Sequence, residues 1–186
     1  MIVAVVGVSL LVRPESNLGP RRPGQHASSA PVVGRCAAAA LRASVIEGGA
    51  EASQPFVIIG LTNTSRSACS LLGYPEVTVR GTPAGNGPIT ALPSATIHGV
   101  YEHADPGPHL VTISPHVQAR FALGTNTASG GSRPLSEIWQ VTISLPGGGG
   151  QLPLALTSPM YASGQPLNIG ITAVEPGIPS SAPSPP

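Results

Sequence analysis

The residues best suited to chemistry lie close together in one polar stretch. Three histidines and two acids fall within twelve positions, namely His98, Glu102, His103, Asp105 and His109, and His116 follows soon after. Imidazole nitrogens and carboxylate oxygens are ligands of zinc and copper, and an extended loop could bring three of them together. The spacings match no known closed metal site, however. A small secreted metal-binding protein or hydrolase using the His98–His116 region therefore stays an alternative, while the favoured expectation is a protein without a metal or cofactor.

The sequence also lacks the common motifs of serine hydrolases and of phosphate-binding loops. A serine hydrolase of the common kind carries Gly-X-Ser-X-Gly on a turn from strand to helix, and the chain has no such pentapeptide. The run Gly147 to Gly150 is not followed by Gly-Lys-Ser/Thr or by a helix, so it predicts a flexible hairpin connection rather than a phosphate-binding loop. Asn63-Thr64-Ser65 matches a glycosylation sequence, but we interpret Asn63 as a turn residue whose side chain bonds to its own backbone. We expect the protein not to be an enzyme.

Charge is sparse and nearly balanced. Charged residues make up 9% of the 186 residues, the formal net charge is +1, and all nine basic residues are arginines. Nucleic-acid binding requires a basic stripe that displaces phosphate counterions, and only Arg21 and Arg22 are adjacent, so we expect no nucleic-acid partner. The absence of lysine, together with abundant Ala, Gly, Pro and Arg, suggests codons rich in G and C, which is a weak indication of an actinobacterial source.

The two cysteines indicate a compartment. Cys36 and Cys69 lie 33 positions apart, one before a strand-like segment and one after a polar turn. A disulfide between them would tie the beginning of the domain to a β-sheet and would require an oxidising compartment. The alternative is two unrelated buried thiols in a cytosolic domain. Arg35 directly before Cys36 does not fit a lipid attachment site, which requires a small residue there.

The ends of the chain differ from its centre. Residues 1–12 are apolar and too short to span a bilayer, but they resemble the apolar region of a secretory signal without its charged leader. A buried strand is the alternative. Residues 13–35 predict a flexible linker rich in Pro, Gly, Ser and Arg, residues 36–175 a folded domain, and residues 176–186 a disordered Pro/Ser tail. Membrane contact is expected only through the N-terminal segment, if it stays uncleaved.

The folded centre carries repeated strand patterns. The expected strands cover residues 41–47, 54–62, 75–81, 118–123, 137–145, 152–156 and 167–173, and the only helical stretch is residues 37–42. Short strands bounded by Gly, Pro, Asn and Ser predict an antiparallel β-sandwich. Residues 54–62 are apolar on both faces, as in a central covered strand. In residues 137–145, alternation places Trp139 inward as the largest core side chain.

One pattern resembles a known family. Cys36 followed by Leu41, then Leu61-Thr62-Asn63-Thr64-Ser65, then Cys69 followed by Gly73-Tyr74-Pro75, and later Ala119-Arg120-Phe121, is similar to secreted proteins and lipoproteins of actinobacteria catalogued only as a domain of unknown function. The resemblance covers roughly residues 36–145. It implies an immunoglobulin-like β-sandwich with paired cysteines, and it implies no catalytic residue. Pro115-His116 departs from the Pro-Gly turn expected before Ala119, so the turn geometry there is an open question.

Together these observations predict an uncharacterised secreted or envelope-associated β-sandwich with a non-catalytic binding or structural role. Its expected partner is a cell-envelope protein or glycan. Convergence of His98, His103 and His109 around a cavity would favour the enzyme or metal-binding alternative instead.

Overall fold

The computed structural model describes residues 33–125 and 135–177, and the statements below concern these residues. The apolar segment predicted at residues 1–12 lies outside the described residues. So do most of the predicted linker and the tail from residue 178 onward.

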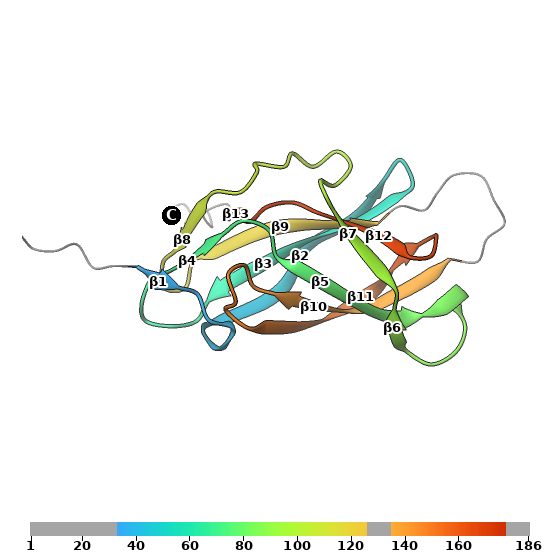
Figure 1. The fold of residues 1–186 in the computed structure, drawn as a ribbon, viewed down its shortest axis with the longest axis horizontal. Helices are drawn as coiled ribbons and strands as arrows, with labels where there is room; N and C mark the ends of the chain where they lie inside the picture. Colours follow the sequence, from blue (N-terminus) through green and yellow to red (C-terminus); the bar gives the residue numbers. More distant parts are fainter. Residues whose placement is uncertain (1–32, 126–134, 178–186) are drawn as a thin grey trace, which may run out of the picture. The chain divides into compact units, whose positions relative to one another are not determined.

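The described chain folds into three sheets (Figure 1). The large sheet has the order β2 (Leu41–Glu51), β3 (Gln54–Asn63), β9 (Gln118–Thr125), β12 (Leu167–Ile171) and β7 (Ser94–His98), and β13 (Glu175–Pro176) also pairs with β9. The second sheet has the order β11 (Gln151–Ala162), β10 (Ser136–Ser144), β5 (Glu76–Thr82) and β6 (Thr90–Leu92). The small sheet has the order β1 (Gly34–Arg35), β4 (Cys69–Leu72) and β8 (Leu110–Ile113). Two short 3₁₀ helices, η1 (Ala38–Ala40) and η2 (Pro83–Gly85), complete the elements.

The core lies between the large and second sheets and follows the alternation of each strand. Apolar side chains from both sheets form one buried cluster, which includes Val77, Val79, Phe121, Leu123, Ile143, Leu152, Leu154, Ile169 and Ile171. Successive side chains of a strand point to opposite faces, so each strand contributes every second residue to this cluster. The predicted β-sandwich is thereby confirmed, as are the predicted inward faces of the strands around Val77, Phe121, Leu152 and Ile169.

The large sheet is also covered on its outer face. Phe56, Ile58 and Ala122 form a second buried cluster there, and Val100 packs against it. Val100 belongs to the long segment between β7 and β8, which Figure 1 shows running beside the large sheet. The expectation that residues 54–62 form a central strand apolar on both faces is therefore confirmed.

The predicted core position of Trp139 is wrong. A β-bulge in β10 leaves Trp139 without a partner, because Ile138 pairs with Gly81 and Gln140 pairs with Arg80. An extra residue in one strand reverses the side-chain alternation beyond it, so Ile138 is fully buried and Trp139 is half-buried at the surface. The bulge depends on Gly81, since a Cβ at that position would collide with the carbonyl oxygen of Glu137.

Two strand pairings in the described chain are parallel rather than antiparallel. β1 runs parallel to β4, and β7 runs parallel to β12. Parallel neighbours require a long connection between them. In both pairs, several other strands lie between the two partners along the chain. β1 lies within the residues predicted to be linker, and β13 extends pairing to Pro176, with the Gly177 N–H donating to the Gln118 carbonyl.

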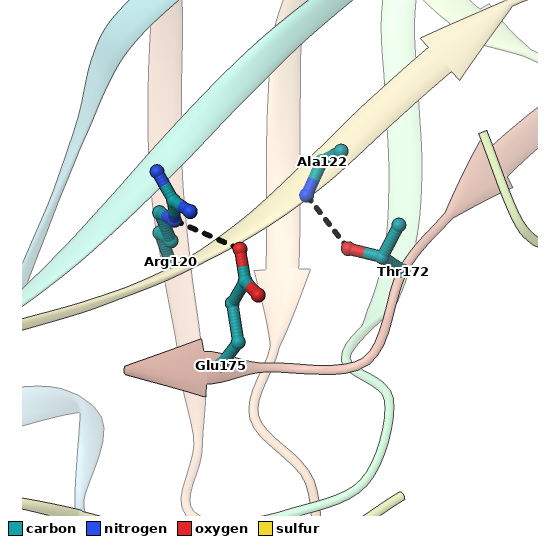
Figure 2. Close-up of polar contacts among 4 residues, drawn as sticks. All are labelled: Arg120, Ala122, Thr172 and Glu175. Atoms are coloured by element: carbon teal, nitrogen blue, oxygen red, sulfur yellow. Dashed lines mark hydrogen bonds and ion pairs between the residues drawn. The ribbon is translucent and has the colours of Figure 1, made fainter. Parts of the chain in front are cut away.

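The chain passes from β12 to β13 through an irregular step along β9. Ile171 pairs with Leu123 and Glu175 pairs with Arg120, so the three residues between β12 and β13 lie opposite only two residues of β9. Figure 2 shows how side chains complete this step: the Thr172 hydroxyl accepts a 2.9 Å hydrogen bond from the Ala122 N–H. The Arg120 guanidinium contacts the Glu175 carboxylate at 2.8 Å.

Replacing Thr172 by valine should destabilise the domain by about 1–3 kcal/mol, because the substitution leaves the buried Ala122 N–H without an acceptor while keeping the side-chain shape. Thr172 is only 3% exposed, so water cannot replace the lost hydroxyl. Urea unfolding measures the change. Thr112→Val, on the exposed face of β8, serves as the matched control. Equal unfolding midpoints for the two variants would contradict this role of Thr172.

Pro115 and His116 form a tight turn before β9. The Val117 N–H donates to the Ser114 carbonyl at 3.1 Å, which closes a four-residue β-turn. His116 is the third residue of this turn and has a φ of 61°. That position of a type II turn favours glycine, because a Cβ is disfavoured at positive φ. Histidine therefore occupies the position of this turn that favours glycine.

His116→Gly should therefore stabilise the domain by about 0.5–1 kcal/mol, since relief of the strained φ outweighs the extra freedom of glycine in the unfolded chain. The exposed His116 side chain contributes little that would be lost. Thermal unfolding measures the gain. Ser114→Gly, in the same turn but without a positive φ, should instead lower the melting temperature. A lower melting temperature for His116→Gly would contradict the interpretation of the turn.

Candidate functional site

The histidines of the polar stretch lie apart, each beside a different neighbour. The His98 ring stacks on Tyr74 at 3.7 Å between centroids, and the His103 ring packs against Phe56 at 4.3 Å. Nδ1 of His109 lies 2.9 Å from the Gly107 carbonyl oxygen. Within the described ranges, no group of three His, Cys, Asp or Glu side chains is arranged to hold a metal ion. The convergence that the metal-binding alternative required does not occur among these residues.

Asp105 is the polar centre of this region. Its Oδ2 atom accepts a 2.6 Å hydrogen bond from the Tyr74 hydroxyl. Its Oδ1 atom accepts hydrogen bonds from the Gly107 N–H at 3.1 Å and the Ala173 N–H at 3.0 Å. The neighbouring Val174 N–H donates to the Gly73 carbonyl. Asp105 therefore joins the long segment between β7 and β8 both to the Gly73-Tyr74-Pro75 turn and to the irregular step after β12.

These contacts keep the carboxyl group of Asp105 ionised. Burial acts to raise the pKa of Asp105, but the hydrogen bonds from Tyr74, Ala173 and Gly107 and the nearby His98 outweigh it, so the pKa lies below 3.8. The same hydrogen bond raises the pKa of Tyr74 above 10.0, with desolvation adding to it. An ionised carboxylate that already accepts three hydrogen bonds is a poor general base. The Asp105 carboxylate therefore holds these loops together through all three of its hydrogen bonds.

The wild type should have a higher free energy of unfolding than Asp105→Asn at pH 6. This difference should shrink as the pH falls below about 4. A carboxyl group whose pKa is lower in the folded state stabilises the fold above its unfolded pKa, and this contribution is lost as the pH falls through the folded value. Urea unfolding of both proteins from pH 6 to pH 2 measures the difference, and the other carboxylates cancel in the comparison. A difference that stays constant across this range would contradict the account.

The sequence contains Tyr74 and Asp105 in two separate patterns that nothing local connects. Tyr74 belongs to the family pattern, and Asp105 belongs to the histidine-rich stretch. They lie 31 residues apart and meet because the long segment folds back onto the β4–β5 turn. One signal was present in the sequence, since Asp105 is the only aspartate of the chain.

Asn63, the last residue of β3, organises the turn that follows this strand. It is fully buried, and its Nδ2 atom donates to the carbonyl oxygens of Ser67 at 2.8 Å and Ile113 at 2.9 Å. Its Oδ1 atom accepts hydrogen bonds from the Ser65 N–H at 2.9 Å and the Ser65 hydroxyl at 2.7 Å. The interpretation of Asn63 as a turn residue is confirmed, and the side chain additionally reaches β8. The asparagine of the glycosylation-like sequence is therefore a buried structural residue.

An apolar surface lies on the small sheet. Leu72 of β4 pairs directly with Leu110 of β8, and the two side chains are 58% and 64% exposed. We call this pair the leucine patch. Beside it lies a hollow of about 560 Å³, lined by Leu72, Tyr74, Glu76, Ser144, Leu145, Pro146, Gly147, Gly148, Gly150 and Gln151. Glu76 is the one charged side chain in this lining.

The cysteines form a disulfide at the edge of this surface. Cys36 and Cys69 are bonded, with a Cα–Cα distance of 4.8 Å, and Cys69 begins β4, the strand that carries Leu72. The predicted pairing is confirmed. In the parts of the chain that the structure describes, no helix is long and apolar enough to cross a membrane.

Comparison with known proteins gives one match. The family model described as "Domain of unknown function (DUF4232)" matches residues 36–174, which covers most of the chain and nearly all of the described sandwich. No curated protein and no solved structure matches the chain. The matched region begins at the first disulfide cysteine and ends at Val174, beside the residue whose N–H binds Asp105. The chain therefore belongs to this family of domains of unknown function.

Proposed function

We propose that the protein is an extracytoplasmic, non-catalytic β-sandwich module that binds another cell-envelope protein through the leucine patch and the adjoining hollow. The observation that carries this proposal is the exposure of two cross-strand leucines beside a hollow of about 560 Å³.

The disulfide supports the compartment. Cys36 and Cys69 are the only cysteines of the chain, and they are joined to each other. Structural disulfides persist in oxidising compartments and are rare in the cytosol, where thiols are kept reduced. Export is also consistent with residues 1–12, whose sequence predicts the apolar region of a secretory signal.

The arrangement of ionisable groups supports a role without chemistry. A general acid or base has to sit in a pocket with a free proton-transfer atom. Asp105 is ionised and uses both carboxylate oxygens to hold backbone and Tyr74 groups. His98, stacked on Tyr74, and His103, packed on Phe56, lie beside different aromatic rings. These groups maintain the loops and are not arranged around a shared reacting centre.

The chemistry of the surface indicates the partner. Exposed apolar patches rimmed by polar residues mark protein interaction sites. Burying the exposed part of these two leucines supplies about 1–2 kcal/mol each. Glu76 lines the hollow and makes no ion pair with any described residue. A protein segment with apolar side chains and one basic residue would satisfy both features. A glycan would leave the leucine side chains exposed, so we assign the patch to a protein.

Site-specific photo-crosslinking in the native cells tests this proposal. A photoreactive amino acid at position 110 should form an adduct with one extracytoplasmic protein, and Leu72→Ser in the same chain should abolish that adduct. Glu76→Arg should also abolish it by charge repulsion. Position 46 provides the matched control, because Ile46 is similarly exposed, at 45%, but lies on β2.

Three results would contradict the proposal. The first is an equal adduct from position 46, which would show nonspecific proximity. The second is an adduct between position 110 and residues 1–32 of the same chain, which would show that the patch is covered internally. The third is an adduct that survives both Leu72→Ser and Glu76→Arg.

A further inference from the structure

We infer that a second hollow, beside Tyr101, binds a single neutral sugar ring, as the terminal unit of a glycan. The site is separate from the leucine patch: it lies on the large sheet and shares no lining residue with the hollow at Leu72. The inference is therefore independent of the proposed function.

The size of the hollow suits one ring. Its volume is about 140 Å³, and it is lined by Gln54, Pro55, Ile97, Gly99, Val100, Tyr101, Gly124, Thr125, Asn168 and Gly170. A cavity on the order of 150 Å³ accepts a benzene ring, so this hollow can take the ring of one sugar while the hydroxyl groups extend toward solvent. Two of its lining side chains, Ile97 and Tyr101, are 50% and 46% exposed, so a ligand can reach apolar and aromatic surface from solvent.

The wall of the hollow is held in place before any ligand arrives. The Gly99 N–H donates to the Ile171 carbonyl at 2.7 Å, and the His103 N–H closes the following turn onto the Val100 carbonyl. Gly124 and Gly170 let this wall lie against the sheet, because a Cβ at Gly124 would come within 2.6 Å of Val100 and one at Gly170 within 2.5 Å of Gly99. A pre-formed wall lowers the entropic cost of binding.

The polar groups of the hollow match hydroxyls. The side-chain amides of Gln54 and Asn168 form no hydrogen bond with any described residue, whereas the Thr125 hydroxyl is already used by the Tyr161 carbonyl. An amide carries both donors and an acceptor, so two free amides can bind neighbouring hydroxyls of a sugar. Small-molecule sites typically combine an apolar or aromatic wall with a few such groups.

The charges nearby exclude anions. No Asp, Glu, Lys, Arg or His side chain lines the hollow. Two acids, first Glu102 and then Glu51, lie near enough to the Tyr101 hydroxyl to raise its pKa. A phosphate or carboxylate ligand would meet these two acids without a balancing cation. The nearby acids therefore disfavour an anionic ligand, and the two free amides in the lining favour a polyhydroxylated one.

Titration of the full-length protein with trisaccharides tests the site. The probes are neutral trisaccharides of glucose, mannose or galactose, with trigalacturonate as the anionic comparison and N-acetylphenylalaninamide as the aromatic one. Backbone amide NMR signals of Gly124, Asn168 and Gly170 report binding. At least one neutral trisaccharide should shift them in a saturable way, with a dissociation constant on the order of 1 mM. Tyr101→Ala and Asn168→Ala should each weaken this binding about tenfold or more.

Tyr161→Ala is the matched control, because Tyr161 is also exposed, at 42%, but does not line the hollow. It should leave the dissociation constant unchanged. The inference is overturned if none of the neutral trisaccharides saturates the signals. It is also overturned if trigalacturonate or N-acetylphenylalaninamide binds in their place, or if Tyr101→Ala and Asn168→Ala bind as well as the wild type. The leucine patch is tested by a different experiment, so either result can fail alone.

Discussion

Replacing Asn63 by aspartate should lower the free energy of unfolding by about 3–5 kcal/mol at neutral pH, because it places an unpaired charge in a buried site. The native amide donates to the carbonyl oxygens of Ser67 and Ile113. A carboxylate at this position has no hydrogen to donate and faces two carbonyl oxygens, so both hydrogen bonds become repulsive contacts. Urea unfolding, followed by far-ultraviolet circular dichroism, measures the loss.

Asn168→Asp is the control for this substitution. Asn168 is exposed on β12, so the same chemical change should alter the free energy of unfolding by less than about 0.5 kcal/mol there. Asn63→Asp would contradict the assignment if its unfolding midpoint matched that of Asn168→Asp. That result would mean that water or a rearranged loop satisfies the two carbonyl groups.

Loss of the disulfide should cost about 3–4 kcal/mol in the chain-entropy model, since Cys36 and Cys69 close a loop of 33 residues. The double variant Cys36→Ala/Cys69→Ala removes the link, and both positions are buried, so alanine avoids an unpaired hydroxyl. Denaturant unfolding of the wild type, with and without reductant, should reproduce most of the same loss.

Free-thiol titration provides the check on this prediction. The denatured, unreduced protein isolated from its native cells should contain close to no free thiol. Two titratable thiols per chain would contradict both the disulfide in the cell and the extracytoplasmic compartment proposed from it. Equal unfolding midpoints for the double variant and the wild type would contradict the energetic role alone.

The strands that alternate regularly could be predicted from the sequence. Val77 and Val79 on β5, and Leu152, Leu154 and Leu156 in the first half of β11, alternate with exposed residues, and burial of one face fixes such a pattern. Trp139 could not be placed in this way. The bulge in β10 depends on the contact between Glu137 and Gly81, which lie far apart in the sequence, so local alternation carried no sign of the reversal.

The candidate sites were less predictable because each depends on contacts between distant segments. The histidine-rich stretch is compact in sequence, but it extends along the sheet and separates the rings of His98 and His103. Leu71 and Leu72 are identical in type, but alternation along β4 turns Leu71 into the core and leaves Leu72 exposed beside Leu110. The hollow at Tyr101 requires β3, β9, β12 and the long segment together.

The most direct test of the proposed docking role is the affinity of the purified protein for the partner captured at position 110. The measurement compares the wild type, Leu72→Ser/Leu110→Ser and Ile46→Ser by isothermal titration calorimetry. We predict that the double variant binds at least about tenfold more weakly, while Ile46→Ser binds as the wild type does and all three proteins unfold at the same temperature. Equal affinity of the double variant and the wild type would contradict the account.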